Sequence, residues 1–510
     1  MVEHGDRTPD RTPDRTPDRR GPRAPARTPR QRSVTAPSER TRRAEPSRFA
    51  AYTLLRAVDE GAYANLEMPS ILRRHRLEAR DAAFATELAF GTIRWQGFYD
   101  AVIAEAAGRP TTRIDPQVLD VLRLGAHQLL GMRVATHAAA DQTVGLAKVV
   151  AGAGAGGFVN AVVRRISERS LEDWRDAVVP EGGGVPALAV RHSHPEWVVT
   201  ALRAALLGHG RATAQTVDAE LAALLTADND PPRVQVVARP GLVTVDQLCA
   251  YDDVEPSSTS PWGVVLGSGD PGLIPEIRDG RAAVQDEGSQ LVALALAAAE
   301  VADHVPPRWL DLCAGPGGKA GVLGALAVAI GADLTAVEVS PHRADLVRNT
   351  LRALIRHGKR LGRQVEVRTA DGRVVGEDEP GAYGRVLVDA PCTGLGALRR
   401  RPEARWRRQP SDVAELAPLQ RALLASALDA VAPGGVVAYA TCSPHVAETR
   451  FVVSDVLKRR HDIDVVDARP LFTDAVGRPL EGLGEGPYVQ LWPHVHGTDA
   501  MFFALLRKHG

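Results

Sequence analysis

Two cysteines lie in segments that could carry nucleophilic chemistry. Cys392 is part of "DAPCTGLG" and Cys442 is part of "YATCSPH", and each follows an apolar run that is typical of a buried strand. A thiolate is a strong nucleophile, whereas a cysteine inside an apolar core is commonly an inert small hydrophobe. Two thiols, each at the end of a strand, favour the nucleophilic role.

A basic stretch follows the first of these thiols. Six arginines occupy the ten positions from 399 to 408, interleaved with one tryptophan. Arginine suits phosphate groups and an indole ring can stack on an unpaired base, so we predict RNA contacts here. The predicted RNA-binding residues are Arg399, Arg400, Arg401, Arg405 and Trp406. The alternative is a solvated basic helix.

A glycine-rich turn, "DLCAGPGGKAG" at residues 311–321, lies between a predicted strand and a predicted helix. Glycines let the backbone approach a ligand closely, and the amides at a helix start carry the positive end of the helix dipole. The turn lacks the lysine-serine ending of a phosphate-binding loop, and Pro316 interrupts the dinucleotide-binding pattern. The turn therefore favours a nucleoside ligand without a phosphate chain.

Acidic residues end the next two predicted strands. Glu338 ends "LTAVEV", where it could accept hydrogen bonds from both hydroxyls of a ribose, and Asp371 follows "VEVRTA", where it could reach an adenine amino group. A nucleoside that crosses three strand ends indicates S-adenosylmethionine as the cofactor. The alternative is that these acids only cap the helices that follow.

A methyl donor beside two thiols indicates cytosine as the methyl acceptor. The C5 carbon of cytosine is a poor nucleophile until a thiolate adds to C6, and a base must later remove the C5 proton. Asp389 could bind the ring N3 and the amino group and stabilise the charge that develops during the addition. One cysteine is the nucleophile and the other assists release, but their spacing does not rank them.

The segment after about residue 286 alternates strands with helices. The apolar runs predict strands, and the amphipathic stretches between them predict helices. The strands are expected at 308–314, 333–339, 364–370, 385–391 and 435–442, and the helices at 319–330, 341–357, 412–430 and 445–459. This order predicts a doubly wound, Rossmann-like α/β domain over 286–510, with ligands at the carboxyl ends of the strands.

The preceding chain divides into three further parts. Residues 47–170 show apolar residues at helical spacing and predict an all-helical domain. Residues 171–285 predict a small α+β connecting domain, including a hairpin around Asp279-Gly280. Residues 1–46 open with "DRTPDRTPDRTPD" and carry 12 Arg against seven acidic residues, which predicts a disordered basic tail. Such a tail could add phosphate affinity or could be a solvated extension.

The whole-chain composition sets further limits. The net charge of the 510 residues is zero, so only local patches can indicate a partner. Four scattered cysteines fit free thiols in a reducing compartment, and no spacing suggests a metal site. With no apolar signal segment and no membrane-length apolar run, we expect a soluble, monomeric, cytoplasmic protein without bound metal.

The motifs resemble those of a known family, the RNA cytosine-5 methyltransferases of the Nop/Sun group, particularly the bacterial RsmB-like (Sun, Fmu) enzymes. The resemblance lies in "DLCAGPGGKA", "DAPCTGLGALRRRPEARW", "YATCSPHVAE" and "VQDEGSQLVAL", while "RDAAFATELAFGTIRW" and "GFVNAVVRRI" are similar to a NusB-type RNA-binding domain. The resemblance spans about residues 48–510. It implies S-adenosylmethionine-dependent methylation of small-subunit ribosomal RNA.

The resemblance also implies roles for individual residues. Cys442 would be the nucleophile and Cys392 the release-assisting thiol. In DNA cytosine-5 methyltransferases the nucleophile is instead the thiol of the proline-cysteine motif, which is Cys392 in this chain, so the presence of Cys442 favours RNA as the substrate. Lys319 would lie near the carboxylate end of the donor. The implied donor contacts are Cys313, Ala314, Gly315, Pro316, Gly317, Gly318, Lys319, Glu338, Arg343, Asp371 and Asp389.

One departure from the family concerns the C-terminus, where "GTDAMFFALLRK" places Ala500-Met501 at the glycine of a usual Asp-Gly-Phe-Phe motif. This departure puts the close approach of the backbone at that position in question.

Three alternative functions also stay open. A tRNA or large-subunit RNA target shares the same chemistry. The set of acids and thiols disfavours a non-catalytic RNA-binding factor, and the basic stretch disfavours a small-molecule methyltransferase.

Overall fold

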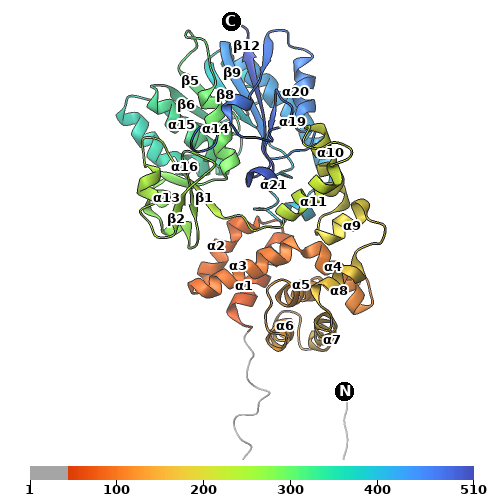
Figure 1. Ribbon diagram of the computed structural model, residues 1–510. Helices are drawn as coiled ribbons and strands as arrows, with labels where there is room; N and C mark the ends of the chain where they lie inside the picture. The colour runs from red at the N-terminus through yellow and green to blue at the C-terminus, as the bar shows by residue number, and fades with distance from the viewer. Residues whose placement is uncertain (1–43) are drawn as a thin grey trace, which may run out of the picture. The chain divides into compact units, whose positions relative to one another are not determined.

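The structure, a computed structural model, describes residues 44–510. The predicted disordered tail at 1–46 therefore lies, apart from its last three residues, outside the described residues. Residues 44–510 belong to one compact unit. From the N-terminus they form a series of helices, a small sheet, and a larger sheet with helices on both faces (Figure 1).

The N-terminal helices begin at clear capping signals. The Glu45 carboxylate accepts hydrogen bonds from the amides of Ser47 and Arg48, and Pro46 occupies the first turn of α1. Asp115 caps α5 in the same way, ahead of Pro116. The helices are α1 Pro46–Asp59, α2 Ala64–His75, α3 Ala79–Arg94, α4 Gln96–Ala107, α5 Pro116–Leu130, α6 Thr136–Val150, α7 Ala155–Ser167, α8 Leu171–Val178, α9 Gly184–Arg191, α10 Glu196–Gly208 and α11 Val217–Ala227.

A four-stranded antiparallel sheet follows, in the order β2-β3-β1-β4. Its elements are β1 Val234–Ala238, α12 Val245–Leu248, β2 Val254–Pro256, β3 Gly263–Leu266, α13 Pro275–Asp279 and β4 Ala282–Val284. The predicted hairpin at Asp279-Gly280 is wrong. Gly280, at φ 79°, ends α13 in the left-handed conformation, and its amide donates to Glu276 and Ile277. An Asp-Gly hairpin turn and a helix C-cap both need positive φ, so the dipeptide alone could not separate them.

The larger sheet has the strand order β10-β12-β9-β8-β5-β6-β7, and β11 pairs with β12. The five predicted strands run parallel, whereas β12 is antiparallel to both of its neighbours, β9 and β10. The strands are β5 Arg308–Asp311, β6 Asp333–Glu338, β7 Val365–Thr369, β8 Tyr383–Asp389, β9 Val431–Thr441, β10 Ile463–Val466, β11 Val489–Gln490 and β12 Phe502–Lys508. The predicted fold class is confirmed, and the antiparallel edge adds to it.

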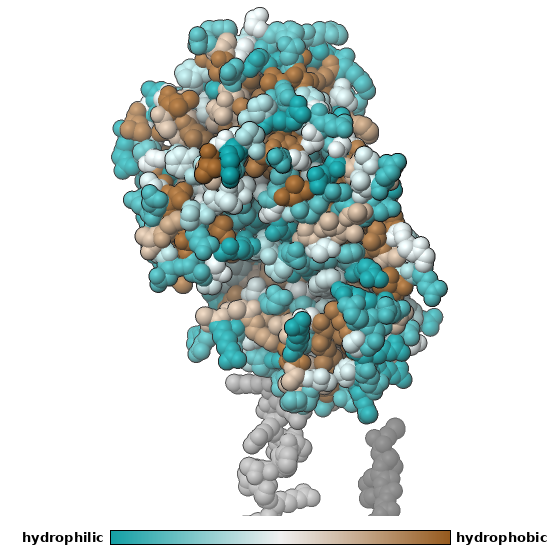
Figure 2. Space-filling model, viewed as in Figure 1, coloured by the Kyte–Doolittle hydropathy of each residue, from teal (hydrophilic) through white to brown (hydrophobic). Residues whose placement is uncertain are grey.

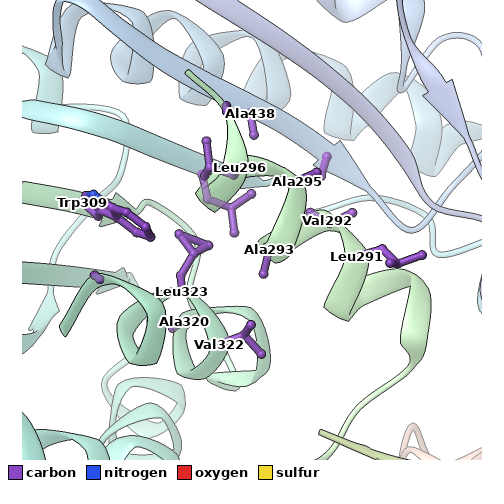
Figure 3. Packing of buried hydrophobic residues seen from close by; sticks show 14 of the residues in the cluster. Leu291, Val292, Ala293, Ala295, Leu296, Trp309, Ala320, Val322, Leu323 and Ala438 are labelled. Atoms are coloured by element: carbon purple, nitrogen blue, oxygen red, sulfur yellow. The ribbon is translucent and has the colours of Figure 1, made fainter. Parts of the chain in front are cut away.

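Helices cover both faces of this sheet. The helices of this part of the chain are α14 Glu287–Ala298, α15 Gly318–Ala329, α16 Pro341–Arg360, α17 Val375–Asp378, α18 Ala404–Arg407, α19 Pro410–Ala430, α20 Arg450–Leu457 and α21 Pro493–His496, of which α14, α15, α16, α19 and α20 pack on the sheet. Successive strand residues point to opposite faces, so Trp309 packs with α14, α15 and α16, while Leu310 packs with α19 and α20. Figure 3 shows the first of these cores, with Leu296 of α14 and Leu323 of α15 beside Trp309. The two cores fix the carboxyl ends of the strands.

The surface in view mixes hydrophilic and hydrophobic residues over all of these parts (Figure 2). Within residues 44–510, every helix is too short or too polar to cross a membrane. The same residues contain no cluster of three or more His, Cys, Asp or Glu side chains that could hold a metal ion.

Candidate functional site

The site lies where the strand order reverses. The chain runs outward from β5 through β6 to β7, and then returns to place β8 on the other side of β5. Ligands of open α/β sheets bind outside the carboxyl ends of the strands at such a switch point. Asp311 ends β5 and Asp389 ends β8, so both carboxylates border this crevice.

The two predicted thiols meet at this edge of the sheet. The sulfur atoms of Cys392 and Cys442 lie 3.5 Å apart, on the turns that follow β8 and β9. The Gly396 amide donates to the Cys442 carbonyl at 2.9 Å and so joins the two turns. A Cβ at position 396 would lie 2.8 Å from that carbonyl, so this approach requires glycine.

The two thiols differ in their affinity for protons. A hydrogen bond from Cys392 lowers the pKa of Cys442, and the cations Lys319 and Arg401 act in the same direction against burial and Asp389. The same contact, together with burial, raises the pKa of Cys392 well above its ordinary value. The pair therefore favours a Cys442 thiolate that accepts a hydrogen bond from a protonated Cys392.

Lys319, which follows the glycine turn, pairs with Asp389 and places its charge near Cys442. Its ammonium group lies 2.8 Å from an oxygen of Asp389, and the structure buries most of the lysine side chain. Burial opposes the charge on the lysine, but the pairing with Asp389 raises its pKa overall. The resemblance implied that Lys319 lies near the carboxylate end of the donor, and this stays a prediction; in the structure the lysine pairs with Asp389.

The glycine turn leaves little room beside Glu338. A Cβ on Gly315 would lie 2.2 Å from an oxygen of Glu338, which is 4% exposed. Arg343 donates to the Gly315 carbonyl at 2.9 Å and lies 3.3 Å from the same carboxylate. Gly317, at φ 108°, then begins α15 without a side-chain cap, so the first amides of the helix stay available. The predicted residues of this turn, Cys313, Ala314, Gly315, Pro316, Gly317 and Gly318, thus lie together at the end of β5.

Asp311 belongs to the site but was not among the predicted site residues. It is buried, and this burial, with the nearby charge of Asp389, raises its pKa to about 7. One of its oxygens accepts from the Cys313 amide at 3.3 Å, while the other has no hydrogen-bond partner among residues 44–510. Burial also raises the pKa of the Cys313 thiol well above its ordinary range, so that thiol is unreactive.

Asp371 lies two residues beyond β7, as predicted. Its carboxylate is paired with Arg373, whose Nε lies 3.0 Å from both oxygens. This hydrogen bonding lowers the pKa of Asp371.

The prediction of an RNA-contacting Arg405 is wrong. The side chain is completely buried, and its guanidinium group donates to Asn229 Oδ1 at 2.7 Å, to the Asp228 carbonyl at 3.0 Å and to the Ser193 carbonyl at 3.1 Å. A longer bond of 3.3 Å reaches the Arg94 carbonyl of α3. Arg405 therefore connects the helical N-terminal part to the α/β domain, because the segment that carries it is inserted between them.

Two further members of the basic stretch also have internal contacts. Trp406 donates from its indole nitrogen to the Ile93 carbonyl at 2.8 Å, and its ring fills the space beside Gly97. Arg400 binds Asp286 at 2.5 Å and Asp499 at 3.1 Å. The prediction that Trp406 and Arg400 contact RNA is therefore corrected: their polar groups are already used inside the protein.

The two remaining arginines are more accessible. Arg401 is exposed and lies over the ring of Tyr63, with 5.7 Å between the guanidinium carbon and the ring centroid. Arg399 is partly exposed and donates to the Gly497 carbonyl at 2.7 Å. These two stay candidates for RNA contact.

The departure at Ala500-Met501 leaves the close backbone approach intact. The Ala500 amide donates to the Gly396 carbonyl at 2.8 Å, and the Met501 carbonyl accepts from the Leu491 amide at 2.8 Å. The glycine that this contact requires is Gly396, since a Cβ there would lie 2.2 Å from the Ala500 carbonyl.

A buried carboxylate beneath the thiols was missed by sequence reasoning. Glu448 accepts hydrogen bonds from Thr393 and Ser443, the residues that follow the two cysteines. The available signal was an acid six residues after Cys442, in "CSPHVAE". A single acid at that spacing also fits the cap of the next helix, so the pattern was not specific.

Comparisons with known proteins show which family and fold this chain resembles. Residues 297–507 match the family model described as 16S rRNA methyltransferase RsmB/F, and residues 45–168 match the NusB family. The Mycobacterium tuberculosis protein named methyltransferase Rv1407 is 51% identical over 472 residues, which cover 92% of this chain and 98% of that protein. The ribosomal RNA small subunit methyltransferase B of Pseudomonas syringae pv. tomato is 31% identical, over 90% and 96% of the two chains. Among solved structures, that of PH0851 has a TM-score of 0.72 at 22% identity and covers 91% of this chain and 99% of its own.

Proposed function

The chain belongs to the RsmB/F family of 16S ribosomal RNA methyltransferases, and we propose that it methylates C5 of a cytosine in 16S ribosomal RNA through a covalent bond from Cys442. The enzyme is an S-adenosylmethionine-dependent methyltransferase. The observation that carries the cytosine assignment is the pair of sulfur atoms 3.5 Å apart beside the glycine turn. Transfer to a more nucleophilic acceptor atom would need neither thiol. The division of the chain into domains at residues 46, 170 and 285 is part of this proposal.

The residues at the glycine turn fit the methyl donor. The unpartnered oxygen of buried Asp311 and the uncapped amides of α15 are suited to a polar ligand with hydroxyl and amino groups. Bound S-adenosylmethionine supplies an electrophilic methyl group. Glu338 would hold its ribose and Asp371 its adenine, while Arg343 holds the Gly315 backbone in place.

The thiol pair would activate the cytosine. The Cys442 thiolate adds to C6, and the electron pair of the C5–C6 bond then makes C5 nucleophilic. Once C5 carries the methyl group, a base removes the C5 proton, the double bond re-forms and the Cys442 thiolate leaves C6. Cys392, whose sulfur lies 3.5 Å from that of Cys442, would stabilise that thiolate as it departs. The lowered pKa of Cys442 and the raised pKa of Cys392 support this assignment of roles.

Asp389 and Lys319 would bind the polar edge of the base. One oxygen of Asp389 is held by the lysine at 2.8 Å, and its side chain is 27% exposed toward solvent. The exposed oxygen could accept from the cytosine amino group, and the Lys319 ammonium group could donate to N3 as negative charge develops there. Arg401 and Arg399 would contact the RNA backbone.

The test is nucleoside mass spectrometry of RNA from a strain that lacks the gene, followed by bisulfite sequencing. We expect one 5-methylcytosine to disappear from 16S ribosomal RNA and to return when the wild-type gene is restored. Loss of a methyl group from tRNA or 23S ribosomal RNA alone would overturn the 16S assignment. Loss of a methylated base other than 5-methylcytosine would overturn the proposed chemistry.

A further inference from the structure

One carboxylate lies directly behind both thiols. Glu448 is completely buried and lies in the segment between β9 and α20. Its oxygen Oε1 accepts from the Thr393 amide at 2.8 Å and from Gln420 Nε2 at 3.2 Å. Its oxygen Oε2 accepts from the hydroxyls of Thr393 and Ser443, the latter at 2.6 Å. A buried carboxylate with four donors is well satisfied and strongly held.

These donors tie the carboxylate to both thiol-bearing turns. Thr393 directly follows Cys392, and Ser443 directly follows Cys442. The two hydroxyls also lie 3.2 Å from each other. A single side chain therefore fixes the backbone next to each sulfur, and the 3.5 Å distance between the sulfurs depends on it.

The charge of Glu448 acts unequally on the two sulfurs. Its carboxylate contributes to the raised pKa of Cys392, after the contact with Cys442 and burial. The field at Cys442 instead comes from Asp389, which raises its pKa, and from Lys319 and Arg401, which lower it. A negative charge behind one sulfur and cations near the other favour one position for a shared proton.

We propose that Glu448 is a positioning residue that holds the two turns together and, through its negative charge, keeps the shared proton on Cys392 so that Cys442 is the reactive sulfur. This inference deepens the proposed cytosine chemistry and rests on it. Glu448 itself touches neither sulfur nor substrate. It acts through Thr393 and Ser443 and through its field.

The substitution Glu448→Gln separates charge from hydrogen bonding. The amide oxygen can replace Oε1, which faces two obligate donors, the Thr393 amide and Gln420 Nε2. The amide nitrogen can replace Oε2, because the two hydroxyls on that side can turn to accept. Glu448→Ala removes both charge and contacts. Glu415→Gln, at an exposed position of α19, is the matched control.

The first measurement needs no RNA. Reduced protein is treated with iodoacetamide at pH 7, and the alkylation rates of Cys392 and Cys442 are measured by peptide mass spectrometry. Because the pKa of Cys442 is lowered and that of Cys392 is raised, we expect Cys442 to react faster in the wild type and in Glu415→Gln, by about tenfold for each unit that separates the two pKa values. In Glu448→Gln this ratio is expected to fall about threefold or more while the melting temperature stays within a few degrees.

The second measurement is methyl transfer to 16S ribosomal RNA. Glu448→Gln is expected to lower kcat about threefold or more and to leave the KM for RNA unchanged, because its contacts lie behind the thiols. Glu448→Ala is expected to lower both kcat and the melting temperature. An unchanged alkylation ratio in Glu448→Gln would overturn the inference, even if activity fell.

The two proposals fail in different ways. If wild-type enzyme forms no 5-methylcytosine, the proposed function fails, whatever the alkylation ratio. If it forms 5-methylcytosine and Glu448→Gln alkylates like the wild type, the proposed function stands and the role of Glu448 fails.

Discussion

Replacing Arg405 with methionine is expected to destabilise the protein rather than to weaken its contact with RNA directly. The guanidinium group is completely buried and makes two short hydrogen bonds, to Asn229 Oδ1 at 2.7 Å and to the Asp228 backbone carbonyl at 3.0 Å, with longer bonds to the backbone carbonyls of Ser193 and Arg94. Hydrogen bonds to a charged group contribute about 1.5–3 kcal/mol each, so the two short ones amount to about 3–6 kcal/mol.

The electrostatic surroundings point the same way. Burial raises the pKa of Asp228 to about 7, and the charge of Arg405 is the largest effect that opposes this rise. Without the arginine, the buried Asp228 carboxyl loses the largest of these opposing charges, and only the smaller effects of Arg399 and His494 are left. A loss of about 4 kcal/mol corresponds to a fall in melting temperature of about 10 °C for a domain of this size.

The assay is thermal unfolding by circular dichroism, with RNA binding measured well below the transition. Arg401→Met is the matched control, because Arg401 is exposed on the same segment and is expected to affect RNA affinity but not the melting temperature. An Arg405→Met protein with a wild-type melting temperature and weakened RNA binding would show that the buried-link interpretation is wrong.

Three further predictions concern the site. Lys319→Met removes a cation that lowers the pKa of Cys442, so the pH midpoint of Cys442 alkylation should move upward. Each unit of this upward shift means about tenfold less thiolate at neutral pH. An unchanged midpoint would refute the role of Lys319. Asp311 has a folded-state pKa of about 7, above its unfolded value near 3.9, so its contribution to stability is present below about pH 4 and is lost as the pH rises through 7. Asp311→Asn should therefore flatten the decline of the urea midpoint between about pH 4 and pH 7, and an equally steep decline would contradict this. Gly315→Ala places a methyl group against Glu338 and should weaken S-adenosylmethionine binding about tenfold in calorimetry, whereas unchanged affinity would show that the turn is not the donor site.

The chain carried strong local signals for the fold. The parallel strands are continuous apolar runs that end in acids or thiols, and this pattern located β5 to β9. The antiparallel edge strand β12 was not predicted because its apolar sequence has no helix after it to mark a parallel crossover. Gly280 was misread because a glycine with positive φ serves a hairpin turn and a helix end equally well.

The chemistry of the site was more predictable than its surroundings. Cys392, Cys442 and Asp389 come together because each ends a strand on one edge of a sheet, and strand ends are visible in the sequence. The burial of Arg405 was not visible in the sequence, because six arginines in ten positions are typical of a surface segment and two of the partners of Arg405 lie 176 and 311 residues away in the chain. Glu448 was missed for a similar reason: its importance comes from contacts that only the fold creates.

The most direct test of the central claim is to trap the enzyme on RNA that contains 5-fluorocytidine. A base can remove a proton from C5 but cannot remove fluorine in its place, so the bond between sulfur and C6 should persist after methyl transfer. Peptide mass spectrometry then identifies the cysteine that carries this bond. The account predicts an adduct on Cys442, no adduct in Cys442→Ala, and adducts that accumulate even on unmodified RNA in Cys392→Ala. An adduct that persists in Cys442→Ala, or one that maps to Cys392 in the wild type, would contradict it.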